Sequence, residues 1–157
     1  MELALAEARL AAQEGEVPVG AIALIEGKVV AARHNERESS ADPTAHAEIL
    51  ALRDAAASLG GWRLSEVTLV VTLEPCPMCA GALVAARVSR IVFGASDPRA
   101  GACGTLYNLC ADPRLNHELD VTGGVGAAAC GDLLSSFFAQ KRADPATPPP
   151  PAPSGTA

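Results

Sequence analysis

Residues 67–95, VTLVVTLEPCPMCAGALVAARVSRIVFGA, decide the fold of this chain. The β-branched run at 67–73 (VTLVVTL) predicts a buried strand, and Pro75 ends it. A helix is expected from residue 77 to about residue 87, and a second strand at 89–93. A strand, a helix and another strand therefore follow one another within about thirty residues.

The flanking segments predict further helices and strands. Two apolar runs around the turn Glu26-Gly27 predict a hairpin, and neither run alternates cleanly, so both faces of its strands are expected to be covered. Asp42-Pro43-Thr44 is expected to open the second helix. The expected helices lie at 3–14, 42–58, 77–87 and 127–142, with a short helical piece at 106–109, and the expected strands lie at 19–25, 28–32, 67–73, 89–93 and 119–122. This alternation predicts an α/β domain with three layers, α/β/α, around a central mixed sheet.

Length and composition predict one domain with a disordered end. A chain of 157 residues can bury a sizeable single core without disulfides. Half of its 12 prolines stand in the last thirteen residues, so we expect a folded domain at 1–142 and a disordered proline-rich tail at 143–157. No run reaches the roughly 18–20 apolar residues of a membrane span, and the start MELA lacks the positive charge of a secretory signal. The expected location is the cytoplasm.

Charge and cysteine content narrow the partners and the chemistry. The net charge of −6 argues against a nucleic-acid partner, but residues 80–117 carry four arginines against two acids, a local balance of +2. An odd number of cysteines, five, argues against a disulfide framework and for metal ligation or plain burial. Cys103, Cys110 and Cys130 are predicted to be buried apolar residues, and His34 is predicted to be structural.

Two short motifs carry the chemistry. His46-Ala47-Glu48 opens the second helix, and Cys76-Pro77-Met78-Cys79 stands where a strand meets the third helix. His46, Cys76 and Cys79 fill three tetrahedral positions and leave the fourth for water, which is the pattern of a catalytic zinc site. Glu48 is then free to act as general base beside that water.

Each motif alone allows other interpretations. A Cys-x-x-Cys pair also occurs in redox sites and structural zinc sites, and a histidine at a helix start is usually a cap or a packed ring. The combination is far more specific, because it supplies three zinc-type ligands and one spare carboxylate. It resembles the signature of zinc deaminases that act on flipped-out bases.

The chain resembles the cytidine and deoxycytidylate deaminase superfamily, and within it the bacterial tRNA-specific adenosine deaminases. The similarity runs from about residue 3 to residue 142, through VPVGA at 17–21, DPTAHAEI at 42–49, LEPCPMCAGA at 73–82 and GACGTL at 101–106. The resemblance implies hydrolysis of the wobble adenosine of a tRNA anticodon to inosine. It further implies one zinc ion per subunit on His46, Cys76 and Cys79, a proton shuttle at Glu48, a hydrogen bond from Asn35 to the flipped nucleoside, and a homodimer that binds the anticodon stem-loop.

Other residues are weaker candidates for substrate contact. Asp97, Asn116, His117, Phe138 and Arg142 are expected near the RNA, although Asn35 and Asp97 also suit turns, His117 suits a cap and Phe138 suits the core. Two other functions remain open at this point. One is a free-base or nucleoside deaminase, for guanine or cytosine, with the same zinc chemistry. The other is a non-catalytic zinc module that binds RNA, which the spare carboxylate of Glu48 disfavours.

Overall fold

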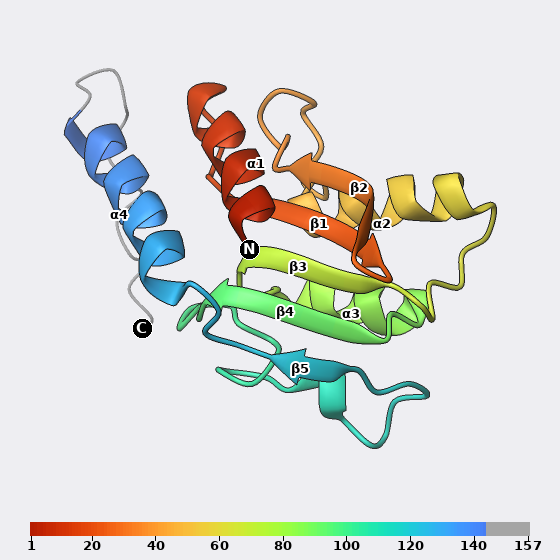
Figure 1. Cartoon of the computed structure of the whole chain (residues 1–157). Coiled ribbons are helices and arrows are strands. Elements are labelled where there is room, and N and C mark those ends of the chain that lie inside the picture. Colours follow the sequence, from red (N-terminus) through yellow and green to blue (C-terminus); the bar gives the residue numbers. More distant parts are fainter. Residues whose placement is uncertain (144–157) are drawn as a thin grey trace.

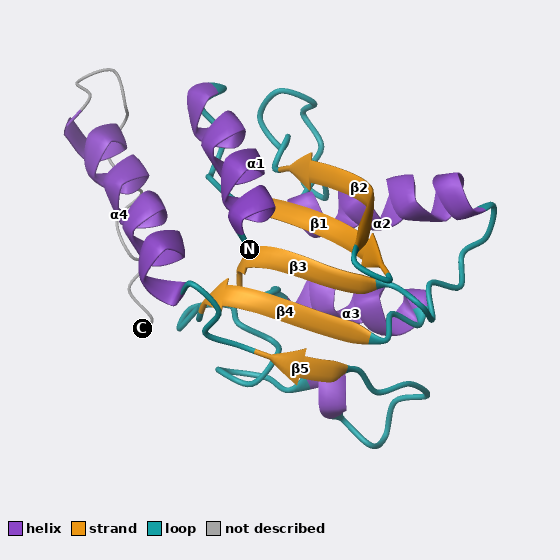
Figure 2. Cartoon of the chain, viewed as in Figure 1, coloured by secondary structure: helices purple, strands orange, loops and turns teal. Residues whose placement is uncertain are grey.

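The structure, a computed structural model, describes residues 1–143 (Figures 1 and 2). Its elements in chain order are α1 (Glu2–Gln13), β1 (Gly20–Ile25), β2 (Lys28–His34), α2 (Ala47–Leu59), β3 (Thr68–Leu73), α3 (Pro77–Ala86), β4 (Arg90–Ala95), the 3₁₀ turn η1 (Leu109–Ala111), β5 (Asp120–Thr122) and α4 (Ala127–Ala143). The predicted tail therefore lies almost wholly outside the described residues. None of the helices up to residue 143 has the length and hydropathy needed to span a bilayer.

The strands form one mixed sheet in the order β2-β1-β3-β4-β5. β1 pairs antiparallel with both β2 and β3, whereas β3, β4 and β5 run parallel to one another. Helices α1 and α4 lie on one face of the sheet, and α2 and α3 lie on the other (Figure 1). The predicted three-layer α/β/α architecture is confirmed.

Small residues bring α1 very close to the sheet. Ala4, Ala8 and Ala11 form the buried face of this helix and are fully inaccessible to solvent. Gly20 opposes them at the start of β1, where a Cβ atom would lie 2.6 Å from the backbone nitrogen of Ala8. The low aromatic content of the chain thus corresponds to a core built on close backbone approach rather than on large rings.

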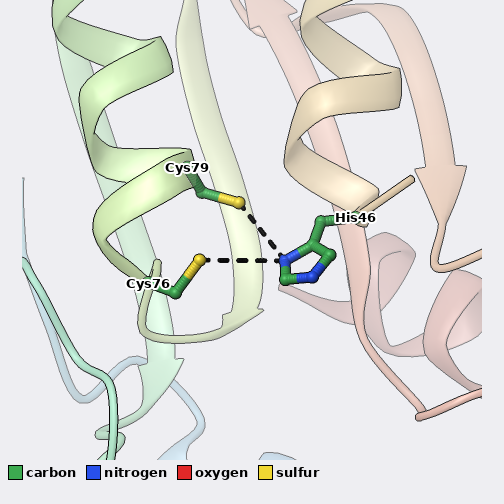
Figure 3. A group of neighbouring side chains, drawn as sticks. All are labelled: His46, Cys76 and Cys79. Carbon is green, nitrogen blue, oxygen red and sulfur yellow. Dashed lines mark hydrogen bonds between the residues drawn. The ribbon is translucent and has the colours of Figure 1, made fainter. Parts of the chain in front are cut away.

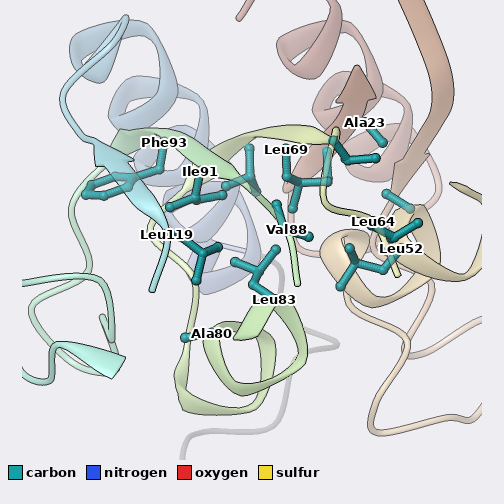
Figure 4. Packing of buried hydrophobic residues seen from close by; sticks show 14 of the residues in the cluster. Ala23, Leu52, Leu64, Leu69, Ala80, Leu83, Val88, Ile91, Phe93 and Leu119 are labelled. Atoms are coloured by element: carbon teal, nitrogen blue, oxygen red, sulfur yellow. The ribbon is translucent and has the colours of Figure 1, made fainter. Parts of the chain in front are cut away.

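The main core lies between the sheet and the layer of α2 and α3 (Figure 4). Leu64, Leu69, Leu83 and Ile91 are its largest fully buried apolar side chains. At about 1.5–3 kcal/mol for each buried aliphatic side chain, this layer supplies much of the driving force that holds both helices against the strands.

The strand directions bring the segments with the candidate site residues to the same end of the strands. β2 and β3 are both antiparallel to β1, so they point the same way, and β4 is parallel to β3. The carboxyl ends of these three strands therefore lie at one edge of the sheet, and from there the chain enters α2, α3 and the loop after β4. In open α/β sheets such an edge is where ligands bind.

Two predicted boundaries and one burial pattern were wrong. The second helix begins at Ala47 rather than at residues 42–44, because an Asp42 oxygen accepts the Thr44 N–H at 2.7 Å and His46 is still extended. The short helical piece lies at 109–111 instead of 106–109, since the N–H groups of residues 106 and 107 both turn back to Gly101. β2 is not covered on both faces: as an edge strand it leaves Val29 47% exposed.

Candidate active site

Three side chains from two helix starts meet at the carboxyl edge of the sheet (Figure 3). His46 directly precedes α2, Cys76 directly precedes α3, and Cys79 lies in the first turn of α3. The Nδ1 atom of His46 lies 3.8 Å from the Sγ of Cys76 and 3.5 Å from the Sγ of Cys79. All three atoms lie within 4.8 Å of one another, so one metal ion can contact all of them.

The spacing of these atoms suits tetrahedral zinc. With zinc–sulfur bonds of about 2.3 Å and zinc–nitrogen bonds of about 2.0–2.1 Å, tetrahedral geometry separates nitrogen from sulfur by about 3.6 Å. The two separations of 3.5 and 3.8 Å are within about 0.2 Å of that value. The soft sulfur and imidazole ligands also favour zinc over magnesium or calcium.

The electrostatics of the two cysteines fit a cation between them. The pKa of Cys76 is lowered to about 4, because Cys79 and His46 both hydrogen-bond its sulfur. The same Cys76 contact, together with burial, raises the pKa of Cys79. Two thiolates this close repel each other unless a cation compensates them, and the amino end of α3 adds positive potential at the same place.

Glu48 reaches the same place from the first turn of α2. Its side chain is 4% exposed and is close to Cys79, yet its oxygens are not part of the three-atom cluster. Burial raises the pKa of its carboxyl group above the usual value. Because His46 is extended and only Glu48 is helical, the two side chains can converge although they stand two residues apart. The carboxyl group therefore lies beside the three side chains that could hold a metal ion.

Asn35 joins the hairpin to the start of α2. Its Oδ1 accepts the N–H of Ala47 at 2.9 Å, and the residue is 5% exposed. This bond satisfies one of the free N–H groups at the start of α2. Asn35 also lines a cavity beside His46 and Glu48.

A cavity of about 170 Å³ lies over these groups, and a larger groove lies next to it. The cavity is lined by Asn35, His46, Glu48, Cys76, Asp97 and Arg37, among others. The adjoining groove of about 590 Å³ is lined by Asp97, Arg99, Phe138 and Arg142, among others. Because Asp97 borders both spaces, the two are neighbours. The structure thus brings three of the five weaker candidates, Asp97, Phe138 and Arg142, to the site.

Comparison with known proteins identifies the family. Residues 1–142 match the MafB19-like deaminases. The chain belongs to this deaminase family. It is 50% identical to the tRNA-specific adenosine deaminase of Bacillus subtilis over 142 residues, which cover 90% of this chain and 88% of that protein. The resemblance inferred from the motifs is confirmed.

Solved structures agree with this assignment. A tRNA:A34 deaminase, studied for A-to-I editing at the wobble position of transfer RNA, superposes with a TM-score of 0.83 at 42% identity, covering 85% of this chain and 97% of that one. A guanine deaminase from Nitrosomonas europaea gives a TM-score of 0.73 at 28% identity, covering 88% and 82%. Both the sequence and the fold of this deaminase are therefore more similar to the tRNA enzymes than to this guanine enzyme.

The remaining candidates of the deaminase lie away from the cavity. The Arg87 guanidinium, at the carboxyl end of α3, donates to the carbonyl and side-chain oxygens of Asn116 at 2.6 and 2.8 Å. The His117 ring lies 2.7 Å from the carbonyl oxygen of Val88. Both residues are thus at the end of α3 opposite Cys76.

His34 contacts Glu7 at 2.8 Å, which is a structural role. As expected, Cys103, Cys110 and Cys130 are buried.

The sequence analysis missed Glu74, which shapes the loop beside the site. Glu74 is 2% exposed and accepts hydrogen bonds from the N–H groups of Asp97, Cys103 and Thr105, and from the Thr105 hydroxyl. Its carboxylate therefore joins the end of β3 to the loop after β4. The available signal was a lone acid at the end of an apolar strand, directly before Pro75.

Proposed function

We propose that this deaminase hydrolyses the wobble adenosine of a tRNA anticodon to inosine and releases ammonia. The observation that carries the proposal is the cluster of His46, Cys76 and Cys79 beside a cavity that Glu48 also lines, in a chain half identical to a tRNA-specific adenosine deaminase. Anticodon-loop bases are already unpaired, so moving one of them into a cavity costs less than extruding it from a duplex.

One zinc ion per subunit, held by His46, Cys76 and Cys79, would supply an activated water as the nucleophile. Glu48 takes one proton from the attacking water and delivers it to the adjacent ring nitrogen as the water oxygen bonds to C6 of the purine. Glu48 then carries the second proton of that water to the exocyclic amine, so that the C6–N bond breaks, the C6 oxygen becomes the carbonyl of inosine and ammonia leaves. The buried position of Glu48 favours proton transfer, because burial raises the pKa of its carboxyl group and a carboxylate with a raised pKa is a stronger base toward the water.

Asn35 and the adjoining groove would position the substrate. The side-chain nitrogen of Asn35 donates a hydrogen bond to the flipped nucleoside, while its oxygen stays bonded to the start of α2. Phe138 is 42% exposed in the groove, where a neighbouring base can stack on it. Asp97 and Arg142 would contact ribose and phosphate groups. Asn116 and His117, beyond the far end of α3, would contact only RNA that extends away from the cavity.

We further propose a cytoplasmic homodimer. An apolar groove of about 390 Å³ between α2 and α3 is lined by Ile49, Leu52, Ala56, Trp62, Ala82 and Ala85, among others. Trp62 is 57% exposed there, and exposed apolar surface of this kind is typical of protein interfaces. Sedimentation analysis of the protein and of Trp62→Ala tests this, since the variant is expected to dissociate at concentrations where the parent is dimeric.

The proposed reaction is tested with zinc-loaded protein and two kinds of substrate in parallel. One is an anticodon stem-loop with a wobble adenosine, and the other is a panel of free bases and nucleosides. Inosine in the stem-loop alone is the expected result. Ammonia from guanine or cytosine alone would keep the chemistry and assign the chain to base salvage instead. Binding of RNA without any turnover would favour the non-catalytic zinc module.

A further inference from the structure

The arginines of this acidic protein differ in how their side chains are engaged. Six of them have a polar, ionic or aromatic partner: Arg33, Arg53, Arg63, Arg87, Arg90 and Arg114. Three of these, Arg87, Arg90 and Arg114, belong to the segment 80–117 whose charge balance is +2. Arg99 is the fourth arginine of that segment, and within residues 1–143 no partner holds its guanidinium. Within this segment, Arg99 is therefore the arginine whose charge is free to bind a ligand.

Arg37 is the counterpart of Arg99 on the other flank of the cavity. Its side chain borders the catalytic cavity, and its charge acts on the imidazole of His46. No side-chain partner engages it in the part of the chain that the structure describes. The neighbouring Glu36 does not neutralise it, because the Glu36 carboxylate is paired with Arg33.

The backbone around Arg37 is held on both sides. The N–H of Glu36 donates to the Ala45 carbonyl at 3.0 Å. The N–H groups of Glu38 and Ser39 each donate to one oxygen of the buried Glu16 at 2.8 Å. A charged side chain is thus presented from a fixed backbone, and such a position limits the entropy lost when a ligand binds.

The backbone at Arg99 is fixed in a similar way. One Asp97 oxygen accepts the N–H groups of Arg99 and Ala100 at 2.8 and 3.2 Å, which closes a tight turn. The turn is tied to the buried Glu74 through the N–H of Asp97. The Arg99 side chain is exposed and borders the groove beside the cavity.

We propose that Arg37 and Arg99 form a phosphate clamp, in which each guanidinium binds one of the two phosphates that flank the target adenosine. This inference rests on the proposed function. Arg37 follows β2 and Arg99 follows β4, and these strands are three intervals apart in the sheet. At about 4.8 Å per interval the two segments are about 14 Å apart, which two long side chains can bridge around one nucleotide.

A phosphodiester fits these two groups better than a base or a protein partner. Arginine presents paired N–H donors that match two phosphate oxygens, and that contact does not depend on base identity. The clamp would hold the backbone on both sides of the flipped nucleotide, while the buried Asn35 recognises the nucleoside itself. Free nucleosides lack these phosphates, so the clamp would favour RNA over free nucleosides as substrate.

The test measures binding and single-turnover deamination of the anticodon stem-loop by zinc-loaded protein. Arg37→Gln and Arg99→Gln are compared with Arg9→Gln, an exposed arginine on α1 that borders neither space. Each clamp variant is expected to bind roughly 5- to 30-fold more weakly, which is below the full effect of a hydrogen bond to a charged group because both side chains are exposed to solvent. The slope of log affinity against log salt should fall by about 0.7 for each lost phosphate contact in a single strand. Arg37→Lys should keep the slope, and Arg9→Gln should change neither quantity.

Stem-loops with one neutral methylphosphonate linkage identify the contacted phosphate. If Arg37 binds one flanking phosphate, neutralising that phosphate weakens the wild type but weakens Arg37→Gln no further, and the other phosphate gives the same result for Arg99→Gln. The clamp would be overturned if the losses of affinity from variant and methylphosphonate were fully additive at both phosphates. It would also be overturned if folded, zinc-loaded variants kept the wild-type affinity and salt slope. In either case, inosine formation by the wild type would still uphold the proposed function. A wild type that forms no inosine in the unmodified stem-loop would overturn both.

Discussion

Replacing Glu74 by Gln tests how the loop beside the active site is held. The carboxylate accepts four hydrogen bonds: its Oε1 takes the N–H groups of Cys103 and Thr105 at 3.1 and 3.0 Å. Its Oε2 takes the Asp97 N–H at 3.0 Å and the Thr105 hydroxyl. The space is tight, because a Cβ on Gly101 would collide with Oε2. A glutamine keeps the shape but replaces one acceptor by an NH₂ donor.

The expected loss follows from which acceptor disappears. The amide nitrogen is best tolerated at the Oε2 position, because the Thr105 hydroxyl can rotate away while the Asp97 N–H cannot. The partly buried Asp97 N–H then loses its partner, at a cost of about 1–3 kcal/mol, and the two remaining bonds lose their charge assistance. We therefore expect the free energy of unfolding to fall by about 2–4 kcal/mol. Activity on the stem-loop should fall too, because Asp97 borders the cavity.

Urea denaturation of wild type, Glu74→Gln and the exposed Glu118→Gln measures this effect. The control is expected to stay within about 0.5 kcal/mol of wild type. Burial raises the pKa of Glu74, but hydrogen bonds from Thr105, Asp97 and Cys103 outweigh it and leave the pKa lowered. The contribution of this carboxylate is therefore present above the unfolded pKa of about 4.3 and is lost as the pH falls through the folded value. Equal stability of Glu74→Gln and Glu118→Gln at neutral pH would refute the reasoning.

Three further substitutions separate metal binding, substrate binding and packing. Cys76→Ala should lose zinc and melt at a lower temperature, because the other ligands are left without a complete site; normal zinc content in metal analysis would count against this. Asn35→Asp keeps the acceptor that caps α2 but loses the donor to substrate, so stability should hold while kcat/KM falls by about 10²-fold, and an unchanged kcat/KM would exclude that contact. Gly94→Ala places a Cβ 2.6 Å from a backbone carbonyl oxygen and against a buried sulfur, so denaturation should show a loss of about 1–3 kcal/mol, whereas Gly61→Ala, with open space around it, should show none.

Local patterns predicted most of the fold. The expected strands and helices overlap the observed ones because β-branched runs, Pro77 at the start of α3 and Gly60 at the end of α2 act within a few residues. The pairing of His46 with Cys76 and Cys79 was also predictable, since few other roles use those residue types at that spacing.

Long-range contacts determine what the sequence analysis missed. The start of α2 depends on a hydrogen bond that the Ala47 N–H donates to the side-chain oxygen of Asn35, twelve residues away, and local capping rules do not contain it. Glu74 holds residues up to 31 positions distant, so its role appears only once β3 and β4 pair. The exposure of Val29 follows from strand order, because a central strand with the same sequence would be covered. Arg37 was overlooked because the sequence does not show that Glu36 pairs with Arg33, which leaves the charge of Arg37 uncompensated beside the cavity.

The most direct test of the catalytic site compares zinc-loaded wild type with Glu48→Gln on the wobble-adenosine stem-loop, measuring inosine in a single turnover together with zinc content and melting temperature. Since Glu48 is not one of the three side chains that could hold the metal, the variant should bind one zinc ion per chain and have the melting temperature of the wild type. Its rate should fall by at least about 10²–10⁴-fold, the usual contribution of a general acid–base group. A folded, zinc-loaded Glu48→Gln protein that forms inosine at nearly the wild-type rate would contradict the proposed proton shuttle.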